Sequence, residues 1–170
     1  MEIRLAEEAE LPQINGIINE AAVAYRDVIP ADRWHEPYMP MEEMQRELGD
    51  GVVFWVAEED GVVLGVMGMQ DRGEVELIRH AYVSSRAQRG GIGTALLRHI
   101  VQRTSKPILI GTWAAAHWAI AFYQRNGFRL VDDAEKNRLL TTYWTIPERQ
   151  IETSVVLAQH SAGALTRQVV

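Results

Sequence analysis

The sequence predicts one α/β domain, of the α+β kind, with a mixed central sheet of about six to seven strands flanked by helices. Residues 52–58 and 62–70 have the pattern of two strands, and the turn residues Glu59-Asp60-Gly61 between them indicate a hairpin. Further along, strand and helix patterns alternate with short connections, which predicts a parallel crossover. A chain of 170 residues is long enough for one sizeable core. An antiparallel hairpin beside a parallel crossover makes the sheet mixed.

Apolar periodicity gives the elements in order. Residues 3–5 alternate with charges and predict a first strand, and residues 8–28 predict a helix with Ile14 and Ile17 on its apolar face. Residues 30–40 form a loop. The other expected elements are helices at 41–48, 91–104, 115–126 and 135–144, and strands at 75–83, 107–112, 128–131 and 151–158. We assign residues 1–160 to the domain and residues 161–170 to a C-terminal tail.

Composition excludes several classes of protein. The net charge is −6 and no basic run interleaved with aromatic residues occurs, which argues against a nucleic-acid partner. No apolar run approaches 18 residues and no signal peptide is recognisable, so we expect no membrane association and a cytoplasmic location. Cysteine is absent and no paired histidine and carboxylate spacing occurs, so no metal site is expected.

A glycine-rich segment, Gln88-Arg89-Gly90-Gly91-Ile92-Gly93, follows the apolar run at 77–83 and opens a helical pattern. Glycines allow a turn whose N–H groups point inward, and a helix N-terminus favours negative charge. A phosphorylated ligand is therefore expected here. The dinucleotide fingerprint does not fit, because its third glycine is replaced by Leu96, and the lysine of a P-loop is missing.

Two motifs carry a family resemblance. Gln88, Gly91 and Gly93 fit the pattern [QR]-x-x-G-x-[GA], and residues 119–128 fit A-I-x-[FL]-Y-x-[KR]-x-G-F. In order, spacing and element type this pair resembles the GCN5-related N-acetyltransferase (GNAT) superfamily. The resemblance implies acetyl-CoA as co-substrate, with its pyrophosphate on backbone amides of the glycine loop and its pantetheine arm along the preceding strand. The implied cofactor-binding residues are Ala81, Tyr82, Val83, Gln88, Arg89, Gly90, Gly91, Ile92, Gly93 and Thr94.

Two proton-transfer roles follow from the expected chemistry. Tyr123 occupies the tyrosine position of the second motif, and a phenol with a pKa near ~10 is suited to protonate a leaving thiolate. The general base is less clear. We favour Glu76, then His80, on the strand before the glycine loop, where residues of one parity share a face if the strand is regular. A bulge would reverse that parity beyond it.

The loop at 30–40 is the expected acceptor side, and Trp34 and Tyr38 are its candidate substrate residues. Packing of these aromatic rings on the core is the alternative. The predicted function is transfer of an acetyl group to a primary amine by direct attack in a ternary complex, since no cysteine can carry the acyl group. A homodimer is compatible with the sequence. The rival hypothesis is a non-catalytic acyl-CoA-binding sensor or regulatory module, favoured by Ala116, where the family often has asparagine.

Overall fold

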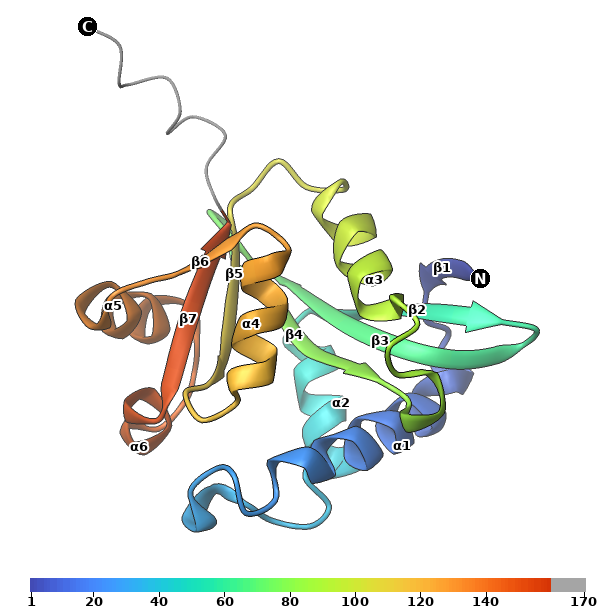
Figure 1. The fold of residues 1–170 in the computed structure, drawn as a ribbon, viewed down its shortest axis with the longest axis horizontal. Coiled ribbons are helices and arrows are strands. Elements are labelled where there is room, and N and C mark those ends of the chain that lie inside the picture. Colours follow the sequence, from blue (N-terminus) through green and yellow to red (C-terminus); the bar gives the residue numbers. More distant parts are fainter. Residues whose placement is uncertain (160–170) are drawn as a thin grey trace, which may run out of the picture.

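The computed structural model describes residues 1–159 and builds them around one seven-stranded sheet (Figure 1). The predicted tail at 161–170 lies outside the described residues. Across the sheet the strand order is β1-β2-β3-β4-β5-β7-β6. In chain order the strands are β1 (Glu2–Leu5), β2 (Val52–Glu59), β3 (Val62–Asp71), β4 (Glu76–Val83), β5 (Ile108–Trp113), β6 (Phe128–Leu130) and β7 (Ser154–Gln159).

The sheet is mixed, as predicted. Among the described strands β4 and β5 pair in parallel, and the other neighbours pair antiparallel. The parallel ladder is short, from Glu76 opposite Ile108 to Ile78 opposite Ile110. β4 then continues to Val83 and β5 to Trp113 without further pairing to each other within residues 1–159. The two strands therefore separate towards their carboxyl ends.

Helices cover both faces of the sheet (Figure 1). One face carries α3 (Ile92–Val101) and α4 (His117–Arg125). The other carries α1 (Leu11–Ala22) and α2 (Met41–Gly49) over the N-terminal strands, with α5 (Asp133–Tyr143) and α6 (Glu148–Glu152) over the C-terminal ones. No helix within residues 1–159 has the length and apolar character needed to cross a bilayer.

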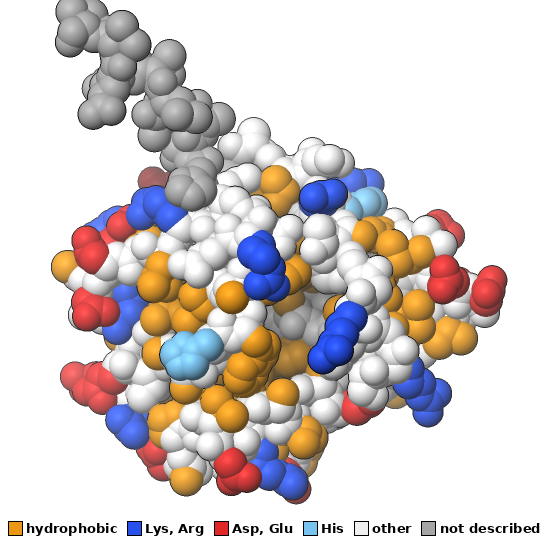
Figure 2. Space-filling model, in the orientation of Figure 1, with side chains coloured by type: hydrophobic (Ala, Val, Ile, Leu, Met, Phe, Trp, Pro, Cys, Tyr) orange, Lys and Arg blue, Asp and Glu red, His pale blue; other side chains and the backbone are white. Residues whose placement is uncertain are grey.

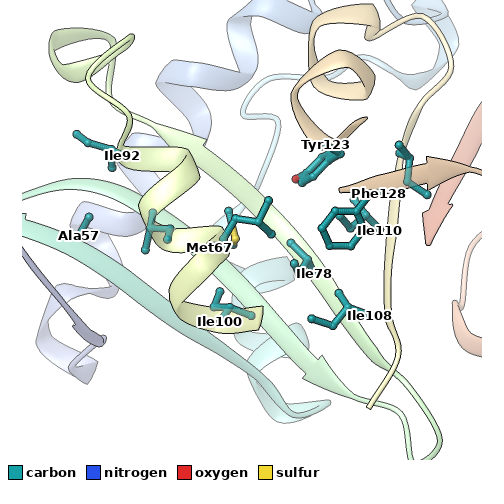
Figure 3. Packing of buried hydrophobic residues seen from close by; sticks show 12 residues of the cluster. Ala57, Met67, Ile78, Ile92, Ile100, Ile108, Ile110, Tyr123 and Phe128 are labelled. Atoms are coloured by element: carbon teal, nitrogen blue, oxygen red, sulfur yellow. The ribbon is translucent and has the colours of Figure 1, made fainter. Parts of the chain in front are cut away.

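Alternation along the strands divides the core between the two faces. Leu77 of β4 packs in the cluster under α5, whereas the next residue, Ile78, packs in the cluster under α3 and α4 (Figure 3). On α3, Leu96, Leu97 and Ile100 are at most 1% exposed. Each such side chain stabilises the fold by roughly 1.5–3 kcal/mol relative to exposure. α3 is thus fixed on the sheet, and the segment before it is held at the carboxyl end of the central strand β4.

Several predicted elements are shorter in the structure, and the short helix α6 was missed. The predicted helix at 8–28 is α-helical only at Leu11–Ala22, with 3-10 turns at Glu8–Glu10 and Val23–Tyr25 on either side. The final strand, expected at 151–158, begins only at Ser154, because the residues after Pro147 form the short helix α6. A helix of this length has too few turns to show a period in the sequence. The helix predicted at 135–144 is confirmed as α5.

Candidate active site

The glycine loop has the backbone of an anion site. Gly91 is the N-cap of α3 and has a φ of +76°, a left-handed conformation that glycine adopts without a Cβ penalty. Arg89, two residues earlier, also has a positive φ, +69°. Beyond the turn, the first-turn amides of Ile92, Gly93 and Thr94 have no carbonyl four residues back to bond. Together with the helix dipole, these free amides form a site that favours negative charge.

Two glycines let α3 lie close to its neighbours. A Cβ on Gly65 of β3 would stand 2.8 Å from Cγ2 of Ile92, so only glycine accommodates the start of α3 there. A Cβ on Gly93 would stand 3.3 Å from the ring of Phe122 on α4. The N-terminus of α3 is therefore pressed between β3 and α4.

A cavity of about 620 Å³ opens beside this loop. That volume falls within the range of small-molecule and cofactor sites. Figure 2 shows a hollow on this face, with hydrophobic side chains in it and basic ones near its rim. The arginines that line the cavity are Arg89 and Arg125, both exposed. Nine of the ten predicted cofactor residues line it, and Gly90 is the exception: Ala81, Tyr82, Val83, Gln88, Arg89, Gly91, Ile92, Gly93 and Thr94.

A second cavity of about 150 Å³ lies where β4 and β5 separate. Residues 78–82 of β4 and residues 111–113 of β5 line it. No aspartate or glutamate of the described residues is part of its lining. Its lining includes six tyrosine and tryptophan side chains, Tyr25, Tyr38, Tyr82, Trp113, Tyr123 and Trp144.

Tyr123 lines both cavities. Its side chain is 6% exposed, and its ring is held against Phe122 and Phe128 at centroid distances of 5.1 and 6.1 Å. The hydroxyl points away from Phe128 (Figure 3). Burial, and secondarily the neighbouring phenol of Tyr25, raise the pKa of Tyr123 above its usual value. The phenol therefore stays protonated at neutral pH, at the place where the two cavities meet.

A bulge in β4 determines which side chains face the second cavity. Gly68 of β3 pairs with Arg79 and Val66 pairs with Tyr82, so one β3 residue stands opposite both His80 and Ala81. His80 has a φ of +51°. Arg79 and His80, which would point to opposite faces of a regular strand, both bond the carboxylate of Glu47 on α2.

The structure does not bring the favoured base, Glu76, to either cavity. Glu76 lies at the start of β4, where its carboxylate accepts a hydrogen bond from Thr104 at 3.0 Å. Positions 76 to 79 keep the regular alternation, but the bulge at 80–81 breaks it, so His80 does not share the face of positions 76 and 78. His80, the second candidate, does line the second cavity.

The two candidate substrate residues of the loop at 30–40 lie in different places. Tyr38 lines the second cavity and accepts a hydrogen bond of 2.9 Å from Nε1 of Trp113. Burial raises the pKa of its phenol. Trp34 lines neither of the two cavities and stacks on Tyr38 at 5.7 Å. Asn19 of α1 fixes the end of the loop, since its side chain bonds both the N–H and the carbonyl of Met39.

Sequence reasoning missed two residues of this region. Tyr25 lines both cavities from the end of α1 and stacks on Trp118. Glu47 lies three residues after the fully buried Met44, on the inward face of α2. A carboxylate at an inward helical position was a signal that the sequence offered. Ala116, at the N-cap of α4, is fully buried against Trp113.

A phosphate-favouring loop, a buried phenol and a second cavity at a strand separation are the features expected of an enzyme that transfers a group from a phosphorylated donor. Similarity to known proteins supports one family. Residues 50–130 match the model of the acetyltransferase (GNAT) domain. The chain is 28% identical over 151 residues to the peptidyl-lysine N-acetyltransferase YiaC of Escherichia coli strain K12, covering 89% of this chain and 99% of that protein.

Solved structures agree on the fold. The ribosomal-protein-alanine N-acetyltransferase of Brucella melitensis matches with a TM-score of 0.65 and 24% identity, covering 94% of this chain and 99% of that one. The PaiA N-acetyltransferase of Thermoplasma acidophilum, solved with coenzyme A, matches with a TM-score of 0.67 and 15% identity over 94% and 99% of the two chains. The family match over residues 50–130 and the similarity to YiaC support an acyltransferase of the GNAT superfamily. The family match favours an enzyme over a non-catalytic binding module.

Proposed function

We propose that this enzyme transfers the acetyl group of acetyl-CoA to a primary amine by direct attack in a ternary complex. The observation that carries the proposal is the position of Tyr123, whose side chain lines both the cavity at the glycine loop and the cavity at the strand separation. A donor in the first and an acceptor in the second would meet beside one phenol. Absence of cysteine from the chain supports direct attack over a cysteine-bound acyl intermediate.

The residues present fit acetyl-CoA. In the proposed complex the amides of residues 92–94 bind the pyrophosphate, and Arg89 and Arg125 at the rim add positive charge. The backbone of Ala81, Tyr82 and Val83 lies along the cavity, where a pantetheine arm can bond to it. Tyr123 protonates the sulfur as the thiolate leaves.

A lysine side chain on a peptide is the acceptor we propose to test first. The relative aligned over nearly its whole length is a peptidyl-lysine N-acetyltransferase. The second cavity, at about 150 Å³, suits a slender alkyl chain, and its aromatic walls favour an ammonium group through their ring faces.

Thiol release from acetyl-CoA tests the function. Lysine-containing peptides, peptides with a free N-terminus and small alkyl amines are supplied separately, and the acetylated product is located by mass spectrometry. We expect thiol release that depends on the amine, with the acetyl group on lysine Nζ. Thiol release at the buffer rate with every amine overturns the proposed function. Acetylation of the peptide N-terminus alone overturns the acceptor.

A further inference from the structure

A polar cluster beneath the β4 bulge has no part in the proposed function as stated so far. It comprises Glu47 of α2, Arg79 and His80 of β4, and Gln70 of β3. Arg79 donates to Oε1 of Glu47 at 3.0 Å and to Oε1 of Gln70 at 3.1 Å. Gln70, only 3% exposed, donates in turn to the carbonyl of Asp50 at 2.9 Å. The remaining oxygen of Glu47, Oε2, bonds Nε2 of His80.

The cluster holds the Glu47 carboxylate in one place. Met44, fully buried, anchors α2 to the core one turn before Glu47. Burial acts to raise the pKa of Glu47, but the hydrogen bond and charge of the His80 ring, followed by the charges of Arg79 and Arg46, hold that pKa below its usual range. The carboxylate is therefore ionised at neutral pH, with a side-chain exposure of 13%.

One ring nitrogen of His80, Nε2, is hydrogen-bonded to Glu47, and the other, Nδ1, is available to a ligand. Glu47, as an ionised carboxylate, accepts a hydrogen bond, so Nε2 of His80 must carry the proton. Nδ1 makes no hydrogen bond within residues 1–159 and is not among their fully buried unpaired atoms. In the neutral ring Nδ1 is thus an unprotonated acceptor, on a residue that lines the second cavity.

We propose that His80 is the general base for the acceptor amine and that Glu47 is the positioning residue that fixes its tautomer and orientation. This rests on the proposed function. The amine nitrogen bonds to the thioester carbonyl carbon, and the C–S bond breaks with its electron pair on sulfur. Nδ1 of His80 takes the N–H proton, and the phenol of Tyr123 protonates the sulfur. The imidazolium then returns one proton through solvent to the phenolate, so acetylation of the neutral amine closes without net proton change. An acceptor that arrives as an ammonium group releases one proton to solvent before the attack.

The charged groups around His80 and Glu47 determine the direction in which the pH profile should shift when Glu47 is changed. Glu47 and Arg79 are the charged groups beside the imidazole, Arg46 acts on Glu47 from α2, and β2 contributes the uncharged ring of Phe54 at 6.3 Å. The other titratable groups that line the second cavity are neutral phenols, Tyr25, Tyr38, Tyr82 and Tyr123. Glu47→Gln leaves Arg79 as the charge beside His80, so protonation of the ring becomes less favourable. The acid limb of kcat/KM then moves to lower pH.

Three variants of the full chain separate the roles. We expect His80→Gln to lower kcat by about 10²-fold, as for loss of a positioned base, with the acetyl-CoA KM near parental. We expect Glu47→Gln to lower kcat by about tenfold and to shift the acid limb, which a merely structural role would not do. The matched control is Glu42→Gln, an exposed change of the same charge on the same helix, which should alter neither.

A measurement on the unmodified protein keeps the test independent of variant folding. Long-range ¹H–¹⁵N correlation of the His80 ring reports its tautomer, and we expect the proton on Nε2. A proton on Nδ1, or an unshifted acid limb in a folded Glu47→Gln, overturns the role of Glu47. An active parent whose His80→Gln variant is equally fast overturns the role of His80 alone. A parent that acetylates no amine overturns the proposed function instead.

Discussion

The two cavities, the proposed donor side and the proposed acceptor side, differ in the parts of the chain that line them. The cavity at the glycine loop is lined mainly by residues 81–94 together with α4, and its proposed phosphate contacts are backbone amides. The second cavity is lined by residues from the turn after α1, the loop at 30–40, β4, β5, α4 and the segment around α5. A site made of local backbone leaves a motif in the sequence, whereas a site assembled from distant side chains does not.

Two left-handed residues show the same contrast. Gly91, at a φ of +76°, is the N-cap of α3, and His80, at +51°, lies in the bulge of β4. Glycine adopts that conformation freely, so its presence in the sequence predicts it. For a residue with a Cβ the left-handed region costs roughly 1–2 kcal/mol, and only the surrounding structure can impose it. The strain at His80 is retained where the side chain meets Glu47 and the second cavity.

The largest expected effect tests the donor side. Gly91→Asp places a carboxylate and a strained backbone where the proposed pyrophosphate binds, so we expect coenzyme A affinity to fall at least about 100-fold. Isothermal calorimetry measures it. The control is Gly61→Asp in the β2–β3 hairpin, which has a similar φ of +78° and open space around it. Retained affinity in Gly91→Asp would show that the phosphate site is elsewhere.

The next effect tests the junction of the two cavities. We expect Tyr123→Phe to lower kcat by about 10²-fold with little change in acetyl-CoA affinity, because its phenol acts only as the thiolate leaves. Steady-state kinetics with calorimetry separates the two quantities. Tyr143→Phe removes an exposed phenol that bonds Glu74, outside both cavities, and should leave both unchanged. Turnover within a factor of two of the parent would make Tyr123 a packing residue.

A smaller effect, on the acceptor KM, should distinguish Tyr38 from Trp34 in the loop at 30–40. Tyr38→Ala removes a wall of the second cavity and the partner of Trp113, so we expect the acceptor KM to rise about tenfold while the acetyl-CoA KM stays near parental. Trp34 packs on Tyr38 outside both cavities, so Trp34→Ala should change the acceptor KM less. Equal rises in both KM values for Tyr38→Ala would contradict a division into donor and acceptor sides.

The smallest expected effect is on the melting temperature, through Glu10, which lines neither cavity. The hydrogen bond from Arg4, aided by the backbone N–H of Glu7, lowers the pKa of Glu10 to about 2. An unfolded chain protonates this carboxylate near 4.5, so its stabilisation is present above that pH and is lost as pH falls towards 2. We expect Glu10→Gln to lower Tm by a few degrees at pH 7, with the difference vanishing near pH 2. Calorimetry checks this, and unchanged kcat separates stability from function.

Much of the fold could be predicted because periodicity is local. The hairpin at 52–71, the crossover through α3 and the helix at α5 all show in the spacing of apolar residues. The ends of elements were less accurate, and the five residues of α6 were missed. Those boundaries depend on caps and packing that a single period does not record.

The sequence by itself determined the mixed sheet, the glycine turn before α3 and the family, since each depends on residue types at fixed short spacing. Only the tertiary structure decided which residues lie at the proposed acceptor side. It left Glu76 at the start of β4, outside both cavities, and placed His80, in the bulge of β4, at the second cavity. It also brought Glu47, 33 positions away in the chain, onto the imidazole of His80. Such contacts arise when separate elements pack, and no local pattern of residues encodes them.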